Sequence, residues 1–130
     1  MPRKRSKTPG GKGYWALPKA VMEHDDFRTL DPYALKVLVA LGTQYNGKNN
    51  GDLSVTLKTL KDHGGMASAT LTKALKTLKE RDLIRVTRPH VKHRSGAACA
   101  LYALSWLEVN ECRGKGLDED LASRPPRRFR

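Results

Sequence analysis

The sequence predicts an α+β fold that is mainly α-helical and carries one small β-hairpin. In residues 54–84, leucines recur three or four positions apart, which is the spacing of one face of an α-helix. In residues 83–106, two apolar or β-branched stretches flank a polar, turn-forming one, as in a β-hairpin. With 130 residues, the chain is long enough for one domain and little more. We therefore expect a disordered basic arm at 1–13, one domain at 14–111 and a mostly disordered basic tail at 112–130.

The two ends of the chain are basic and poor in large apolar side chains. Residues 1–13 hold five Lys and Arg and no acid, and residues 124–130 hold four Arg. Such segments bury too little apolar surface to offset the conformational entropy that folding removes. The N-terminal arm either follows a DNA backbone or minor groove, or serves to keep the chain in solution. The sequence favours neither interpretation.

A helix is expected to begin at Pro32, because Asp31 is a good N-cap and proline suits the first helical position. It is expected to run to about Tyr45. Apart from Lys36, residues 33–41 are apolar all round the helix, which predicts burial on most sides. Such a helix is either the central core helix or a contact between two copies in a homodimer. These two interpretations stay open.

Residues 54–84 predict two helices joined by a tight turn, preceded by a very short strand at 52–53. Ser54 and Ser68 are expected to cap the two helices at their N-termini. Glycines at 64 and 65 allow the backbone angles of the turn. Ala74 lies beside the expected inward stripe of the second helix, which consists of Leu71, Leu75, Leu78 and Asp82. This order is typical of a helix-turn-helix, which places one helix in the DNA major groove.

The second helix, at residues 69–81, has an outer face that is first small and then basic. Small side chains at its start would let the helix lie deep in a major groove, where threonine contacts a base edge or a thymine methyl group. The residues expected to face base edges are Ser68, Ala69, Thr70, Thr72 and Lys73. Lys76 and Lys79 are expected to contact phosphates.

The hairpin is expected to have strands at 83–88 and 97–106 and a basic loop at 89–96. Its cations would also contact phosphates, and they are Arg85, Arg88, Lys92 and Arg94. A helix-turn-helix followed at once by a basic hairpin is rarer by chance than either part. The order is that of a winged helix-turn-helix fold, and it favours binding of double-stranded DNA.

The charge of the chain narrows the class of partner. A formal net charge of +12 indicates a polyanionic partner, either a nucleic acid or an anionic membrane surface. No run of 18 apolar residues occurs, so we expect no membrane span. No apolar segment follows the charged start, so we expect no signal peptide and an intracellular protein.

No enzyme, metal or cofactor site is predicted. Cys99 and Cys112 are too few for a zinc site or a disulfide framework, and Cys99 lies in an apolar run that suits a small core residue. His90 and His93 have the spacing of metal ligands, but no further Cys or His cluster is near them in sequence, so we interpret them as exposed loop histidines. The acidic run around His24 is interpreted as a helix end or a turn. Phosphate-binding glycine motifs and nucleophile motifs are absent, and no small-molecule ligand is expected.

These features resemble the small winged helix-turn-helix proteins of bacterial prophages and mobile elements, which are related in architecture to the DNA-binding domains of phage and plasmid replication initiators. The resemblance covers about residues 15–111. It is carried by the strings LPKAVMEHDDFRTLDPYALKVLVAL, QYNGKNNGDL, ATLTKALKTLKERDLIRVTR and LYALSWL. It implies the order helix, short strand, two helices and wing, and a cytoplasmic, nucleoid-associated location in bacteria. Initiators usually carry a further domain that engages the helicase machinery, for which we expect no room in this chain.

The leading hypothesis is a sequence-specific DNA-binding protein, acting as a transcriptional regulator or a replication-associated protein of a mobile element. The alternative is a protein-interaction module, in which the winged helix docks on a replication, transcription or host-defence protein. The basic ends would then face an acidic partner surface. RNA binding through the arms is a third interpretation.

Overall fold

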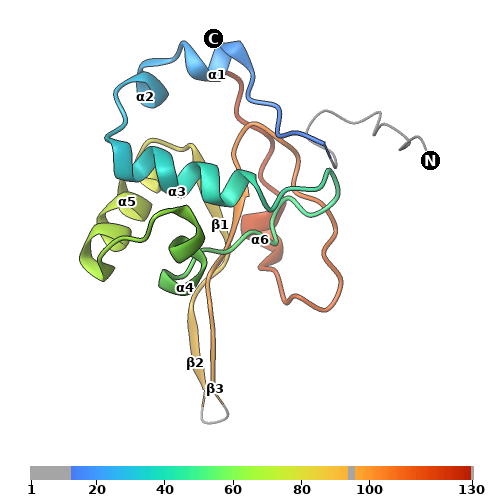
Figure 1. The fold of residues 1–130 in the computed structure, drawn as a ribbon. Coiled ribbons are helices and arrows are strands. Elements are labelled where there is room, and N and C mark those ends of the chain that lie inside the picture. Colours follow the sequence, from blue (N-terminus) through green and yellow to red (C-terminus); the bar gives the residue numbers. More distant parts are fainter. Residues whose placement is uncertain (1–12, 94–95, 130) are drawn as a thin grey trace, which may run out of the picture.

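The computed structural model describes residues 13–93 and 96–129, and these form an α+β fold (Figure 1). The predicted α+β class is thereby confirmed. In chain order the helices are α1 (Lys19–Met22), α2 (Asp25–Arg28), α3 (Pro32–Gly42), α4 (Leu57–Leu60) with a 3-10 turn at Lys61–His63, α5 (Ser68–Glu80) and α6 (Glu119–Ala122). The strands are β1 (Ile84–Arg88), β2 (Val91–His93), β3 (Gly96–Ala98) and β4 (Leu101–Leu104). The expected arm lies outside the described residues, except for Gly13.

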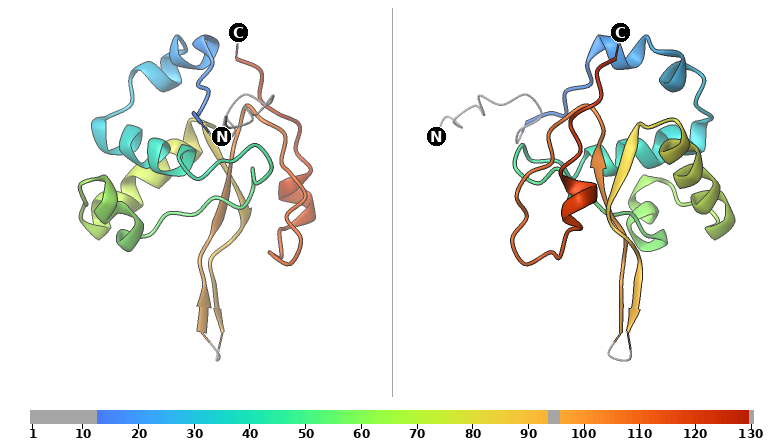
Figure 2. Two further views of the ribbon diagram at one scale, coloured as in Figure 1. Left: turned by 45° about the vertical axis from the view of Figure 1, so that its right-hand side comes forward. Right: turned by 180° about the vertical axis from the view of Figure 1, so that it is seen from behind.

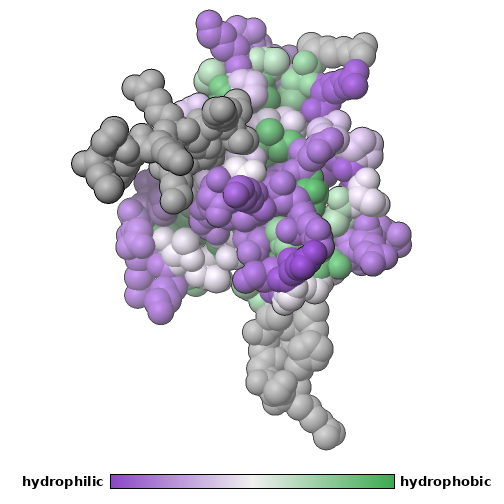
Figure 3. All heavy atoms as spheres, turned by 90° about the vertical axis from the view of Figure 1, so that its right-hand side faces the viewer, coloured by the Kyte–Doolittle hydropathy of each residue, from purple (hydrophilic) through white to green (hydrophobic). Residues whose placement is uncertain are grey.

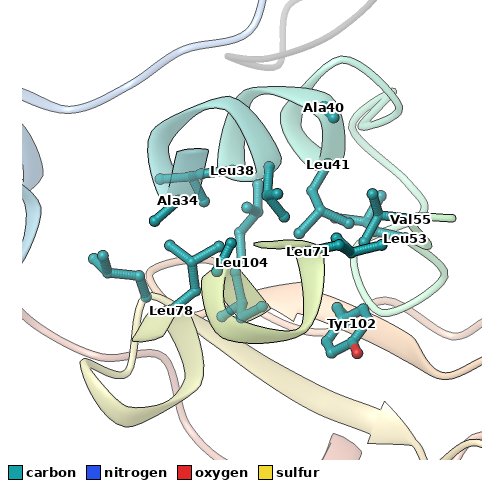
Figure 4. Close-up of a cluster of buried hydrophobic side chains, with 14 of the residues drawn as sticks. Ala34, Leu38, Ala40, Leu41, Leu53, Val55, Leu71, Leu78, Tyr102 and Leu104 are labelled. Atoms are coloured by element: carbon teal, nitrogen blue, oxygen red, sulfur yellow. The ribbon is translucent and has the colours of Figure 1, made fainter. Parts of the chain in front are cut away.

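The core forms where α3 packs across α5, with buried residues of β1 and β4 in the same cluster (Figure 4). α3 begins as predicted: Oδ1 of Asp31 accepts from the backbone amides of Tyr33 and Ala34, both at 3.0 Å. From α3, Leu38 and Leu41 point towards Leu71 and Leu78 of α5 and towards β4, and all are buried. The helix ends at Gly42, earlier than predicted, because the chain leaves it through a turn at Thr43.

The expected burial of α3 on most sides is wrong for its outer side. Tyr33 is 55% exposed, and Leu35 and Val39 are each 38% exposed. The helix packs on α5 and α4 and is covered by Trp15 at Gly42, whereas the outer phases of the helix reach the surface.

The helix pair forms, but its caps differ from the prediction. α4 is capped by Thr56, whose Oγ1 accepts from the amide of Thr59 at 3.1 Å. Ser54 does not cap it, because the backbone of Ser54 is bonded on both sides to the side-chain amide of Gln44. α5 starts one residue earlier than expected: Ser68 is its first residue and Ala67 stands at the N-cap position, with no side-chain cap.

The turn and the inward stripe of α5 largely follow the prediction. Gly64 and Gly65 adopt positive φ angles of 92° and 71°, which glycine tolerates best. Leu71, Ala74 and Leu78 are buried and Leu75 is half-buried. Asp82 does not belong to the stripe. It lies past the end of the helix in a left-handed conformation, with φ of 51°, because the chain turns there into β1.

The hairpin forms as two short antiparallel ladders in succession. β1 pairs with β4, with Ile84 opposite Leu104 and a register shift between Val86 and Arg88. Beyond that shift, β2 pairs with β3, and this outer part projects away from the helices (Figure 1). The predicted loop at 89–96 is therefore shorter, because Val91–His93 is a strand. The very short strand expected at 52–53 is a single bridge between Leu53 and Tyr102.

The C-terminal segment differs from the expected disordered tail. It contains α6, runs back along the strands (Figure 2) and is bonded to them. The amide of Asp118 donates to the carbonyl of Thr87, and the amide of Arg127 donates to that of Ser105, both at 2.7 Å. Phe129 packs edge-on against Trp106 at 6.3 Å between ring centroids. The face that carries this segment is mainly hydrophilic, with small hydrophobic areas between the polar ones (Figure 3).

Candidate nucleic-acid interface

α5 exposes one face along its whole length, opposite the buried leucines. Ala69, Thr72, Lys73 and Lys76 are exposed and lie three or four positions apart, so they share that face. Ser68 and Lys79 extend it at the two ends and are also exposed. Of the five residues predicted to face base edges, only Thr70 is half-buried, because it flanks the inward stripe. The face is small at the start of the helix and cationic towards its end.

Two of the three threonine hydroxyls of α5, those of Thr72 and Thr77, are bonded within the helix. Thr72 donates from Oγ1 to the carbonyl of Ser68 at 3.1 Å, and Thr77 donates to the carbonyl of Lys73 at 3.0 Å. A hydroxyl has one proton, so Thr72 has only its oxygen lone pairs and its methyl group left for a ligand. The chemistry that Thr72 can offer is therefore apolar contact or hydrogen-bond acceptance.

The lysines of α5 are open to a polyanion. Lys76 lies 3.9 Å from the carboxylate of Glu80, with both side chains about two-thirds exposed or more, and such surface pairs are weak. No carboxylate of residues 13–93 and 96–129 lies within ion-pair distance of Lys73 or Lys79. Lys58 and Lys61, which the sequence did not single out, are exposed on α4 and the 3-10 turn.

Arg85, which was expected to contact phosphate, is used inside the protein. Its Nε and Nη2 donate to the two oxygens of Asp82, at 2.8 and 3.1 Å, and its Nη1 donates to the carbonyl of Pro125 at 2.6 Å. Only 15% of its side chain is exposed. The sequence showed the cation but not these partners, one of which is 40 residues away.

Arg88 is turned inwards in the same way. Its Nη1 donates to the carbonyl of Lys115 and its Nη2 to that of Cys99, both at 2.7 Å, while Nε is buried. Both arginines thus bond the hairpin to the C-terminal segment, Arg85 through Pro125 and Arg88 through Lys115, which argues against a phosphate role. The side chain of Lys92 and the whole of Arg94 lie outside what the structure describes, so their expected role is unchanged.

Two further arginines fix the position of α5, and sequence reasoning missed both. Arg81, at the end of α5, donates from Nη1 to the carbonyl of Asp26 at 3.1 Å and to Oγ1 of Thr29 at 2.8 Å. Arg127 donates from Nη1 to the carbonyls of Arg81 and Asp82. The last turn of α5 is thereby held between α2 and the C-terminal segment. No sequence pattern links residues so far apart.

The acidic run around His24 is accounted for by local structure, as predicted. Nδ1 of His24 accepts from the amide of Asp26 at 3.0 Å and caps α2. Asp25 pairs with Arg28, and Asp26 pairs with Arg127 at 2.7 Å. The hydrogen bond from Arg127 lowers the pKa of Asp26 below its ordinary value of 3.8. These groups stabilise a helix end.

The described residues were also searched for metal-binding clusters and membrane-spanning helices. In residues 13–93 and 96–129, no group of three or more His, Cys, Asp or Glu is placed to hold a metal ion. His90 is exposed next to β2, and the side chain of His93 is not described. None of the helices in that same part of the chain has the length and apolar character needed to cross a bilayer.

Comparison with known proteins adds nothing to this description of the interface. The resemblance to small winged helix-turn-helix proteins of mobile elements stays a prediction, carried by the strings quoted above. No protein-family model, no curated protein and no solved structure matches this chain.

Proposed function

We propose that this chain is a winged helix-turn-helix protein that binds double-stranded DNA, with α5 in the major groove and the β2–β3 hairpin beside it. The observation that carries the proposal is the exposed face of α5. Its side chains are small at the start of the helix and cationic further along, and it lies opposite a buried leucine stripe. A formal net charge of +12 supports a polyanionic partner.

The dimensions and chemistry of this face suit a major groove. The 13 residues of α5 span about 20 Å, and B-DNA admits one α-helix in its groove of about 12 Å width. Ser68 and Ala69 permit close approach. Thr72 would place its methyl group against a thymine methyl, and Lys73 would donate to guanine O6 and N7.

Phosphate contacts would come from lysines that the fold leaves open. These are Lys76 and Lys79 of α5, with Lys58 and Lys61 on the preceding helix and turn. Lys92 and Arg94 of the hairpin stay in the proposal on the basis of sequence. Arg85 and Arg88 leave it, because their guanidinium groups are bonded within the protein. The cellular role would be transcriptional control or replication of a bacterial mobile element, at the nucleoid.

Selection from a pool of random duplexes, followed by gel shift, tests the proposal. We expect one enriched motif. When Lys73 is replaced by alanine, the protein should change its base preference at particular positions of that motif. A matched control is Lys48→Ala, since Lys48 is exposed in the loop after α3 and outside the α5 face. Retention of all duplexes alike, unaffected by Lys73→Ala, would contradict the proposal.

The exposed apolar residues of α3 support a second candidate, a protein-interaction module. Leu35 and Val39 lie one turn apart, both exposed, with Tyr33 nearby. This surface would take either a replication, transcription or host-defence protein, or a second copy of the chain. Sedimentation of the wild type and of Leu35→Ser/Val39→Ser separates these occupants, since a concentration-dependent dimer that the double variant loses would identify the second copy.

A further inference from the structure

Lys36 is the only cation of α3, and it has no part in the DNA-binding proposal above. In the sequence it interrupts an otherwise apolar stretch at residues 33–41. In the structure its side chain is exposed and reaches the turn between α4 and α5. Its Nζ lies 3.0 Å from the point where a Cβ of Gly64 would stand. α3 thereby adds a positive charge to the helix pair on which it packs (Figure 1).

Contacts inside the protein do not account for the position of the Lys36 ammonium group. No carboxylate of residues 13–93 and 96–129 lies within ion-pair distance of it. The neighbouring turn is closed by its own backbone, since the carbonyl of Leu60 accepts from the amide of Gly65 at 2.7 Å. The positive charge is therefore available to an external anion.

The turn beside Lys36 also allows an external strand to approach closely. Gly64 and Gly65 carry no side chains, and a Cβ added at Gly65 would meet no atom of the described chain within 4 Å. Glycine is the residue that permits such close approach of a ligand to the protein backbone. Three positions before Gly64, Lys61 is exposed on the 3-10 turn. Two cations from different elements thus accompany an open stretch of backbone.

The place of this turn in the proposed complex identifies the anion. Gly64 precedes Ser68, the first residue of α5, by four positions. A recognition helix contacts base edges with its N-terminal residues, while the preceding helix crosses the phosphate backbone. The turn that joins the two helices then lies where the backbone borders the groove. The anion nearest to Lys36 would be a phosphate group of the duplex.

We propose that Lys36 contacts a DNA phosphate next to the start of α5, so that α3 is a third element of the duplex interface. The inference rests on the proposed function and adds to it a contact from outside the helix pair. Lysine suits this place, because its ammonium group is a point charge on a flexible stem and binds phosphate without a fixed geometry. The contact positions α5 in the groove and carries no information on sequence.

Salt titration of duplex binding tests the contact. One phosphate contact adds about 0.9 to the slope of log affinity against log salt, so Lys36→Ala should make the affinity loss between about 50 and 200 mM salt about 3.5-fold smaller. It should weaken preferred and random duplexes alike and leave the melting temperature unchanged. Lys36→Arg should keep the wild-type slope, because it keeps the charge. Lys48→Ala is the matched control, since Lys48 is exposed in the loop after α3.

Ethylation interference locates the contact on the duplex. Ethylation removes the charge of a phosphate and weakens binding wherever the protein needs that phosphate. With the duplex selected by the wild type, Lys36→Ala should become insensitive to ethylation at one phosphate that flanks the motif. Lys48→Ala should keep the wild-type pattern.

A salt slope for Lys36→Ala equal to that of the wild type or of Lys48→Ala would overturn the inference. A lower melting temperature at an unchanged slope would assign Lys36 to the fold and overturn it equally. The proposed base readout fails separately, through insensitivity of the motif to Lys73→Ala. If selection enriches no motif, titration with a random duplex still tests Lys36, because phosphate contacts do not depend on sequence.

Discussion

Arg127 donates from Nη2 to Oδ2 of Asp26 at 2.7 Å, and so joins the C-terminal segment to α2 across 101 residues of sequence. The same guanidinium also donates to two carbonyls at the end of α5 and lies 4.2 Å from the ring centroid of Phe129. One side chain therefore links the two ends of the described chain to the helix proposed to read DNA. Its replacement affects both stability and the placement of α5.

The Asp26–Arg127 pair makes stability depend on pH in a defined direction. Arg127 lowers the pKa of Asp26 below 3.8, so the pair stabilises the protein above that pH and loses its effect as pH falls through the lowered pKa. Asp26 is 36% exposed, which limits its contribution to about 1 kcal/mol or less. We expect Asp26→Asn to lower the melting temperature at pH 7, and we expect this difference from the wild type to shrink as the pH falls below 3.8.

Arg127→Ala should cost more than Asp26→Asn, about 2–3 kcal/mol, because it also removes a donor from two partly buried carbonyl groups. Urea unfolding at pH 7 measures both variants. Arg128→Ala is the control, since Arg128 is the exposed neighbour. Equal effects of the Arg127 and Arg128 substitutions would show that the C-terminal segment is not anchored as described.

The leucine stripe of α5 should show graded sensitivity. Leu78 is fully buried and Leu75 is half-buried. Leu78→Ala is expected to destabilise the protein by about 2–5 kcal/mol, and Leu75→Ala by clearly less, because part of its side chain already contacts solvent. Chemical denaturation gives both values. The reverse order would mean that the helix is rotated from the position described.

Thr72 allows a test of how the proposed recognition helix reads a base. Its hydroxyl proton is used by Ser68, so the methyl group is the expected contact. Thr72→Val keeps the methyl and should retain the preferred motif, whereas Thr72→Ser removes it and should weaken the preference for thymine at one position by about 1 kcal/mol. Binding to duplexes with uracil at that position, which lacks the methyl group, should abolish the difference between wild type and Thr72→Ser.

Salt dependence should separate lysines that contact phosphate from arginines that hold the fold. Each phosphate contact adds about 0.9 to the slope of log affinity against log salt. Lys76→Ala and Lys79→Ala should each reduce the slope by about that amount without changing the melting temperature. Arg88→Ala should lower the melting temperature and leave the salt slope unchanged, because its guanidinium is bonded to two carbonyls within the protein. A reduced slope for Arg88→Ala at unchanged stability would restore it to the interface.

The sequence predicted the features that depend on neighbours along the chain. The start of α3 followed from Asp31 and Pro32, the turn before α5 from Gly64 and Gly65, and the hairpin from its alternation. The caps were less predictable, since Ser54 and Thr56 are both good cap residues and only the tertiary bond from Gln44 distinguishes them.

Features that depend on distant partners were not predictable. Asn50 is fully buried, donates from Nδ2 to the carbonyls of Leu104, Leu107 and Glu108, and accepts from the amide of Leu104. In the sequence it is one polar residue of a turn. Arg85 and Arg88 likewise read as surface cations, because composition shows a charge but not the carbonyl or carboxylate that satisfies it. The C-terminal segment was expected to be disordered for the same reason, because its composition does not show the distant groups to which it is bonded.

The bonds of Arg127 also bear on the order in which the chain folds. A contact that closes a loop of this length has a large entropic cost, so it is expected to form after the local contacts of α3, α5 and the hairpin. Interactions made after the transition state slow unfolding without speeding folding. The contact between residues 26 and 127 would thus slow unfolding with little effect on the folding rate, while the helix pair sets how fast the native state is reached.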